Sequence, residues 1–365
     1  MQTPQRFRGR GPGSSRLQDA DLRETNEQGF GHRRCERGAA PPAGGGGNRM
    51  TVRFGFSLQG RGILAGREAI TAVAKRADAL GYDSIWVTDR LLIPVQSRSP
   101  YPYSPTGAFP LGPDEPWLEP LTAITYLVTI TERIAVGTSV LVIPYRNPIV
   151  TAKALATADY LSGGRVILGA GIGWWREEFS ALGIPFEDRA ARTIEYLALM
   201  KEIWTRPRVT FEGRFARVAE AGGVRPHPAR KPHIPIWIGG HSEAALRRAA
   251  MIGDGWHPIG LRPPVGLPPR EFADRVRRLR DLAAACGRVP AGITISLKAP
   301  IKFDDAGGAP RTLLSGPPAQ VVEDLCAYAA VGVEHFVLDF SVATVPAMLE
   351  VMDRFAAEVR PHVRA

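Results

Sequence analysis

Glycine-rich turns that follow apolar runs are the parts of this sequence best suited to hold an anion. The segment IWIGGHS ends an apolar run in Gly239 and Gly240 and continues into His241 and Ser242, and serine is a residue type that caps helices. Two glycines let the backbone approach an anion closely, and a helix start presents free N–H groups at its positive end. The segment predicts a phosphate site, although an ordinary tight turn capped by Ser242 would have the same pattern.

A second glycine-rich segment, LGAGIGWW, places Gly169, Gly171 and Gly173 at alternate positions after another apolar run. The spacing is GxGxG rather than GxGxxG, and no acidic residue follows a second strand about 20 residues further on, so a Rossmann site is not expected. Backbone without side chains leaves room here for a flat ring system or a phosphate. Tight packing at the rim of a barrel is the alternative interpretation.

Small polar residues interrupt an otherwise apolar run at Thr138 and Ser139, just before Val140. Such an interruption predicts a bulge or an unusual peptide at a functional site. A plain buried strand is the alternative.

Asp89 and Arg90 follow the apolar run SIWV, and an acid beside a guanidinium at a strand end can bind a substrate or a cofactor. A structural ion pair explains the two residues equally well. The aromatic and proline-rich segment from Pro100 to Trp117 has the length and composition of a lid over a pocket. We expect Trp117, Tyr145 and Trp174 to contact the substrate.

Eight short apolar runs alternate with helical patterns from Arg53 onward. Strands that are apolar along their whole length are typical of parallel sheets that are buried on both faces. Eight strand–helix units predict an α/β fold, a closed (β/α)8 TIM barrel, with an open doubly wound sheet as the alternative. In such a barrel the chemistry lies at the carboxyl ends of the strands, where the segments above fall. The expected strands are Arg53–Leu58, Ser84–Thr88, Ile134–Ile143, Val166–Ala170, Pro235–Ile238, Gly255–Ile259, Ile293–Lys298 and His335–Phe340.

The first 49 residues differ in composition from the remaining chain. They contain four consecutive glycines, scattered arginines and almost no apolar clusters. Such a segment cannot bury enough surface to offset its ordering entropy, so we expect residues 1–49 to be a disordered basic extension and residues 50–365 to be one barrel domain.

Charge and cysteine content narrow the range of partners. The net charge is +10, of which residues 1–49 carry +4 (nine Arg and five acidic residues). The other arginines are dispersed over helical patterns, which favours solvated faces over a nucleic-acid surface. The sequence contains no apolar stretch of about 18 residues, so we expect no membrane-spanning helix. The three cysteines have no metal-ligand spacing, and we expect a cytoplasmic protein with no metal.

Six segments between Thr51 and about Phe355, taken in their order along the chain, resemble the bacterial luciferase-like monooxygenase family. Within it, they are most similar to actinobacterial members that use the deazaflavin coenzyme F420 rather than FMN. The segments are GYDSIWVTDR (81–90), GTSVLVIPYRNP (137–148), LSGGRVILGAGIGW (161–174), EEFSALGIPFEDR (177–189), PIWIGGHSEAALRRAA (235–250) and GDGW (253–256).

The resemblance implies roles for individual residues. A non-prolyl cis peptide between Ser139 and Val140 would bulge against the centre of the cofactor ring, and Asp89 would lie beside that ring. The segment Gly239–Ser242 would contact the cofactor phosphate. The segment Gly171–Glu177, with Gly173 in it, would line the cofactor tail.

The implied activity is hydride transfer between reduced F420 and a small unsaturated or carbonyl-containing substrate. Arg90 and Asp89 are the expected catalytic residues, with Arg90 stabilising developing negative charge. The alternatives are an FMN-dependent monooxygenase fed by a separate reductase and a flavin-binding protein without turnover. We expect a homodimer that binds neither nucleic acid nor membrane.

One departure narrows the implied substrate. Relatives that oxidise sugar phosphates carry His after the strand-two acid and Glu near the glycine-rich turn. Arg90 and Trp174 stand at these positions here. The departure argues against glucose-6-phosphate dehydrogenase activity, and the missing His also argues against light emission.

Overall fold

Eight parallel strands close into a barrel in the computed structural model, which describes residues 51–222, 225–305 and 311–364. The strands follow one another around the ring in chain order, and β10 pairs with both β9 and β12 to close it. The predicted (β/α)8 barrel is therefore confirmed. The ring consists of β1 (Arg53–Gln59), β2 (Ser84–Val87), β3 (Ala135–Thr138), β5 (Val166–Gly171), β8 (Ile236–Gly239), β9 (Gly255–His257), β10 (Thr294–Phe303) and β12 (His335–Phe340).

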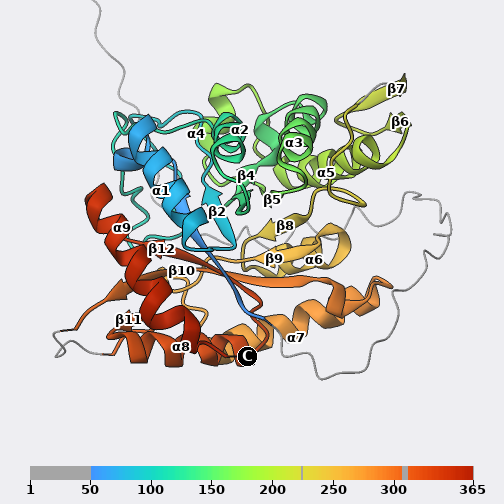
Figure 1. Cartoon of the computed structure of the whole chain (residues 1–365). Coiled ribbons are helices and arrows are strands. Elements are labelled where there is room, and N and C mark those ends of the chain that lie inside the picture. The colour runs from blue at the N-terminus through green and yellow to red at the C-terminus, as the bar shows by residue number, and fades with distance from the viewer. Residues whose placement is uncertain (1–50, 223–224, 306–310, 365) are drawn as a thin grey trace, which may run out of the picture. The chain divides into compact units, whose positions relative to one another are not determined.

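Helices surround this ring on the outside (Figure 1). The longer ones are α1 (Arg67–Ala79), α2 (Pro120–Ile130), α3 (Pro148–Ser162), α5 (Arg189–Thr205), α6 (Glu243–Ile252), α7 (Pro269–Ala285), α8 (Pro318–Ala330) and α9 (Val345–Arg354). A short helix, α4 (Arg176–Ala181), precedes α5, and one π-helical segment (Phe355–Val359) continues α9. The 3-10 turns are Gly62–Leu64, Ile143–Tyr145, Pro290–Gly292 and Arg360–His362.

Local sequence signals set the ends of these helices. Asn147 caps α3, with its side chain accepting the Ile149 N–H at 2.9 Å, and proline occupies the first helical position. Gly163 ends the same helix in the left-handed conformation at φ 70°. Pro185 falls between α4 and α5, where proline cannot continue a helix.

The barrel interior contains a cluster of aromatic side chains that packs with Val337 and Ile167. The Trp86 ring lies 5.1 Å from that of Trp237 and 4.8 Å from that of His257. A Cβ on Gly137 would stand 2.6 Å from a Trp86 ring carbon, so glycine is required there for the indole to fit. Ser84 joins two ring nitrogens, since its hydroxyl accepts the Trp86 indole N–H at 2.7 Å and lies 2.6 Å from Nε2 of His335.

The third predicted strand divides in two at the polar residues. It runs as β3 to Thr138 and resumes as β4 (Leu141–Val142), which pairs with β5. The peptide between Ser139 and Val140 is cis, as predicted. Outside the ring, β6 (Arg208–Glu212) and β7 (Arg217–Gly222) form a hairpin, which projects beyond α5 (Figure 1), and β11 (Ser315–Gly316) pairs with the end of β10.

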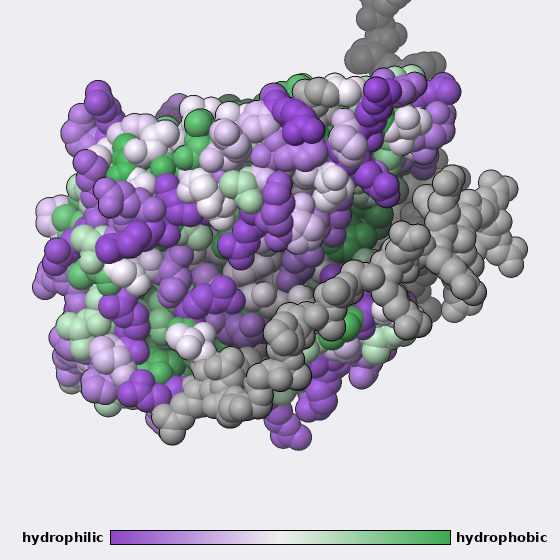
Figure 2. Space-filling view, turned by 45° about the vertical axis from the view of Figure 1, so that its right-hand side comes forward, coloured by the Kyte–Doolittle hydropathy of each residue, from purple (hydrophilic) through white to green (hydrophobic). Residues whose placement is uncertain are grey.

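The surface of the barrel is mostly hydrophilic on the face shown in Figure 2, with hydrophobic residues in small separate areas. Among the helices of the described residues, none is long and apolar enough to cross a membrane. The predicted disordered extension, residues 1–49, lies outside the described residues.

Candidate functional site

A cavity of about 530 Å³ opens at the carboxyl ends of the barrel strands. Its wall contains most of the site residues that the sequence predicts. These are Asp89, Arg90, Trp117, Ser139, Val140, Gly171, Gly173, Trp174, Gly239, Gly240, His241 and Ser242.

Val140 forms one wall of this cavity and is fitted between two glycines. A Cβ on Gly239 would stand 2.7 Å from Cγ1 of Val140, and a Cβ on Gly171 would overlap its Cγ2. Two neighbouring strands thus lack side chains where the Val140 side chain passes them. The arrangement requires all three residue types together.

His257 lies beneath the cis peptide and fixes the neighbouring serine. Its Nε2 is 2.9 Å from the Ser139 hydroxyl, and its Nδ1 is 2.7 Å from the Ser296 hydroxyl. Burial lowers the pKa of His257 to about 3, with a smaller contribution from the positive charge of Lys298. The imidazole is therefore neutral at physiological pH and links Ser139 to Ser296 by hydrogen bonds.

The turn after β8 and the helix α6 that follows it contribute two buried nitrogens without hydrogen-bond partners to this end of the cavity. Ser242 caps α6 by accepting the Ala245 N–H at 3.3 Å, and Gly240 adopts φ 97°, which favours glycine. Within the described part of the chain, Nδ1 of His241 and Nε of Arg248 are buried and lack a hydrogen-bond partner. Burial lowers the pKa of both groups, so His241 is neutral and Arg248 is a poorly compensated cation. This end of the cavity has the chemistry of a phosphate site.

Cations continue outward from this turn along the start of α5. Burial lowers the pKa of Arg248, and the positive charge of Arg189 lowers it further. Burial also lowers the pKa of Arg189, and the positive charge of Arg176 adds to that effect. Arg176 is paired with Glu187 at 2.5 Å, whereas Nε of Arg189 is buried without a partner among the described residues. A run of positive charge therefore leads away from the phosphate turn.

Asp89 is held in a two-pronged ion pair on the floor of the cavity. Its oxygens accept N–H groups of Arg146 at 2.7 and 2.8 Å, and also the Val142 N–H at 2.8 Å. Burial opposes the charge on Arg146, but Asp89 and Glu119 outweigh it and raise the Arg146 pKa. Asp89 thus secures β4, the strand that follows the cis peptide.

Arg90 is paired with a carboxylate that the sequence does not single out. The buried Glu178 accepts from Nη1 of Arg90, from the Leu91 N–H at 2.8 Å and from the Tyr145 hydroxyl at 2.8 Å. Four aromatic rings surround the guanidinium at 4.8–5.8 Å, those of Phe109, Trp117, Trp174 and Trp175. Nε of Arg90 is buried without a partner among the described residues, so one donor remains available to a ligand.

The aromatic and proline-rich segment covers the cavity, as its composition predicts. Tyr101, Tyr103 and Phe109 line the cavity beside Trp174. Glu177 anchors the start of this segment, accepting the Arg98 N–H at 2.6 Å and the Ser99 hydroxyl at 2.6 Å.

Two predicted site residues therefore have contacts outside the cavity wall. Glu177 holds the covering segment, and Tyr145 packs on Phe179 with its ring 4.8 Å away and donates to Glu178. Neither side chain is part of the wall that the other predicted residues form.

The opposite wall contains charged residues that sequence reasoning did not identify as a group. They are Arg61 after β1, Arg262 after β9, Lys298 on β10 and Asp339 on β12. Lys298 is only 5% exposed although it is charged at neutral pH. A lysine within the apolar run TISLKAPI was the available signal.

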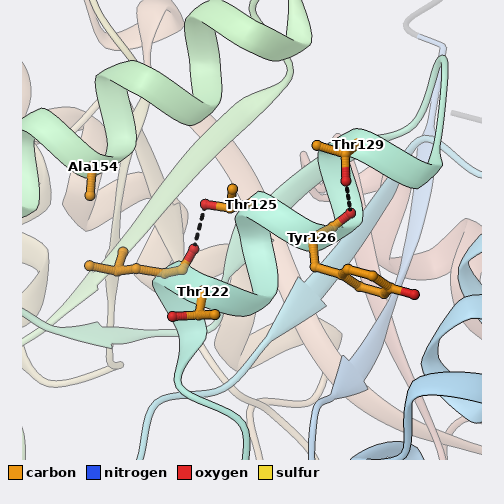
Figure 3. A pocket seen from close by; sticks show the side chains of 6 residues that line it. Thr122, Thr125, Tyr126, Thr129 and Ala154 are labelled. Atoms are coloured by element: carbon orange, nitrogen blue, oxygen red, sulfur yellow. Dashed lines mark hydrogen bonds between the residues drawn. The ribbon is translucent and has the colours of Figure 1, made fainter.

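A second hollow, of about 570 Å³, lies outside the barrel between α2 and α3 (Figure 3). Its wall consists of Leu121, Thr122, Thr125, Tyr126, Thr129 and Ala154. The hydroxyls of Thr125 and Thr129 donate to carbonyls of their own helix at 2.9 and 2.7 Å. These wall residues carry no charge, whereas charged residues line the cavity at the barrel mouth.

Comparison with known proteins agrees with this geometry. The model of the luciferase-like monooxygenase family matches residues 52–309. An uncharacterised protein of Mycobacterium tuberculosis is 35% identical over 213 residues, which are 58% of this chain and 71% of that protein. An F420-dependent glucose-6-phosphate dehydrogenase of Intrasporangium calvum is 30% identical over 334 residues, covering 79% of this chain and 92% of the dehydrogenase.

A solved structure shares the fold at low sequence identity. The F420-dependent secondary alcohol dehydrogenase, solved with an F420–acetone adduct, superposes with a TM-score of 0.68 at 17% identity. The superposition covers 87% of this chain and all of that one.

Proposed function

The chain belongs to the luciferase-like monooxygenase family, and on that premise we propose that it is an oxidoreductase that uses coenzyme F420. The observation that carries the proposal is the run of cations that leaves the phosphate turn, from Arg248 to Arg189. FMN ends at its phosphate, whereas F420 continues into a lactyl group and a glutamate tail with further carboxylates. The F420 dependence named for the Intrasporangium calvum relative supports the same choice.

The residues of the cavity fit a flat cofactor with a phosphate. Val140 presents an apolar face at the centre of the cavity wall, and the glycines beside it leave the neighbouring strands bare. Nε of Arg248 is a buried donor and Nδ1 of His241 a buried polar nitrogen, both without a described partner, and a phosphate would supply the acceptor that Arg248 lacks.

When bound, the deazaflavin supplies a two-electron hydride carrier. The chain contributes binding, orientation and exclusion of water. Tyr101, Phe109 and Trp174 line the cavity with aromatic surface, and the Arg90 guanidinium, whose Nε has no described partner, would donate a hydrogen bond to a substrate oxygen. The ion pair with Glu178 holds the Arg90 side chain in this position.

Titration calorimetry with F420 and with FMN, each at two salt concentrations, tests the proposal. We expect tighter binding of F420, with an affinity that falls as salt rises because salt screens the attraction between the tail carboxylates and the arginines. Arg248→Gln is expected to weaken both cofactors, since both carry the phosphate, whereas Arg189→Gln weakens F420 alone. Arg208→Gln, in the β6–β7 hairpin, is the control for loss of a surface charge.

Equal or tighter binding of FMN to the unmodified protein would contradict the choice of cofactor. It would favour an FMN-dependent monooxygenase with a separate reductase, while the barrel and its phosphate turn would stand. Failure of both cofactors to bind would contradict the proposal as a whole.

A further inference from the structure

Lys298 is a buried cation in the cavity wall that no described counter-charge neutralises directly. It lies on β10 and is 5% exposed. No hydrogen bond or ion pair joins its ammonium group to another described residue, although its side chain lines the cavity. A buried charge of this kind is costly unless a partner of opposite sign reaches it.

The nearby carboxylate is already committed to other groups. One oxygen of Asp339 accepts the Gln59 amide at 2.5 Å, and the other accepts from Arg262. Asp339 is therefore hydrogen-bonded to Gln59 and Arg262, and not to Lys298. Burial lowers the pKa of Lys298 to about 8, and the attraction of Asp339 is opposed by the repulsion of Arg262 and Arg61.

Arg61 is a second cation in the same wall without a described ion pair. Its guanidinium lies 5.5 Å from the centre of the Trp117 ring, a contact that brings no negative charge to it. Burial lowers the pKa of Arg61, and the charges of Asp339 and Glu115 oppose this effect only in part. Lys298 and Arg61 together leave an excess of positive charge in this part of the cavity.

The position of these cations separates them from the phosphate turn. Around the ring, β10, β12 and β1 follow one another on the side opposite β3, β5 and β8. Val140 follows β3 and the phosphate turn follows β8, whereas Lys298 and Arg61 belong to β10 and to the end of β1. A cofactor held at the turn and against Val140 thus leaves the opposite wall for the substrate.

We propose that Lys298 and Arg61 form an anion subsite that receives a carboxylate or phosphate group of the substrate. Arg262 borders this subsite while paired with Asp339, and its remaining N–H groups add to the positive field. The inference rests on the proposed function, because it assigns the anion to the substrate of the cofactor-loaded enzyme. It restricts that substrate to acids and phosphate esters.

Calorimetric titration of the protein saturated with F420 tests the subsite. Saturation fills the phosphate turn, so that a second anion reports on the opposite wall. The probes are lactate, its neutral counterpart propan-2-ol, and inorganic phosphate, and the two anions distinguish a carboxylate site from a phosphate site. We expect at least one anion to bind and propan-2-ol not to bind measurably.

Matched variants locate the binding. Losing a charged hydrogen-bond donor is expected to weaken anion binding about tenfold or more in Lys298→Met and in Arg61→Gln. Lys302→Met removes the same charge from an exposed position further along β10 and is expected to change the affinity less than about twofold. Unchanged anion binding in both cavity variants, or no anion binding to the unmodified protein, would overturn the proposal. If Lys298→Met does not fold, Arg61→Gln decides alone.

An independent readout follows the ammonium group itself. In protein labelled with ¹³C at lysine Cε, the signal that Lys298→Met removes should titrate with a pKa that rises when the anion is added. The same titration without F420, in the Arg248→Gln background, separates the two proposals. A Lys298 signal that responds to the anion while F420 fails to bind would contradict the cofactor alone, whereas F420 binding with an unresponsive Lys298 would contradict the subsite alone.

Discussion

Cγ1 of Val140 lies 2.7 Å from the position that a Cβ would occupy on Gly239. Real Cβ atoms do not approach other atoms so closely, so the strand after which the phosphate turn begins must carry glycine for the Val140 side chain to fit. The cis peptide between β3 and β4 and the glycine-rich turn after β8 are therefore packed against each other. A change at either residue affects both.

Gly239→Ala is expected to displace Val140 and to weaken cofactor binding. The added methyl group overpacks a buried position, so the free energy of unfolding should also fall by about 1–3 kcal/mol. Cofactor titration and urea unfolding measure the two effects. Gly292→Ala adds the same group where nothing lies within 4 Å and should change neither quantity. Native cofactor affinity in Gly239→Ala would show that Val140 does not support the ring.

The sequence predicts each of these segments but not the contact between them. All eight strands overlap the ranges that the sequence predicts, although the third divides in two and the seventh runs on to Phe303, because strand period and glycine turns are local signals. The cis peptide lies where the family resemblance implies it. That Val140 passes between Gly171 and Gly239 depends on the register of three strands. Register across a barrel is a tertiary property that one sequence does not encode locally.

The adjacent residues Glu177 and Glu178 illustrate a second limit. They are one residue apart on α4, so their side chains point in directions that differ by about 100°. One carboxylate is buried beneath Arg90 and the other holds the covering segment. The helix is six residues long and its phase is set by packing, so the sequence gives no basis for choosing between them.

Lys298 marks a third limit of prediction from this sequence. It ends the predicted strand 293–298, and a lysine at a strand end is ordinarily solvated. The structure extends β10 to Phe303 and encloses the ammonium group in the cavity wall. The apolar residues on both sides of it in TISLKAPI hint at an internal position, and the longer strand shows it.

Glu178→Gln is expected to destabilise the protein strongly. The substitution leaves the Arg90 guanidinium, 9% exposed, without its counter-charge, and breaking one side of a buried ion pair costs about 3–5 kcal/mol. Urea unfolding at pH 7 measures the loss. Glu187→Gln breaks an exposed ion pair with Arg176, so its effect should stay below about 1 kcal/mol. Equal effects of the two substitutions would contradict the structural role of Glu178.

Stability is expected to fall as the pH decreases below 6.5. His257 has a folded pKa of about 3 against an ordinary value of 6.5, so between these values the unfolded chain binds a proton that the folded chain does not. Proton uptake by the unfolded state costs about 2 kcal/mol at pH 5 for one such histidine. The buried His335, whose pKa is also lowered well below its ordinary value, acts in the same direction.

His257→Gln tests this dependence while keeping a hydrogen-bonding side chain near Ser139. The free energy of unfolding, measured by urea between pH 7 and pH 4, should fall less steeply in this variant than in the unmodified protein. His362→Gln, at an exposed position near the end of the chain, should leave the slope unchanged. A slope that is the same in all three proteins would refute the assignment of His257.

Lys298→Met is expected to raise the stability of the protein at pH 7, in contrast to most substitutions of a buried residue. Below its folded pKa of about 8 the lysine is charged in both states, and the folded protein bears the cost of burying that charge. An apolar side chain of similar length removes the cost, which we place at about 1–3 kcal/mol. As the pH rises from about 8 to the ordinary lysine value of 10.5, the folded protein loses the proton first, so the unmodified protein gains stability and the advantage of the variant disappears. Urea unfolding of the unmodified protein, Lys298→Met and Lys302→Met at pH 7 and pH 10 measures both effects, and Lys302→Met should match the unmodified protein at each pH. If Lys298 serves an anionic substrate, Lys298→Met should be more stable and should bind neither lactate nor phosphate. If Lys298→Met is instead less stable than the unmodified protein at pH 7, the electrostatic cost on which the inference depends is contradicted.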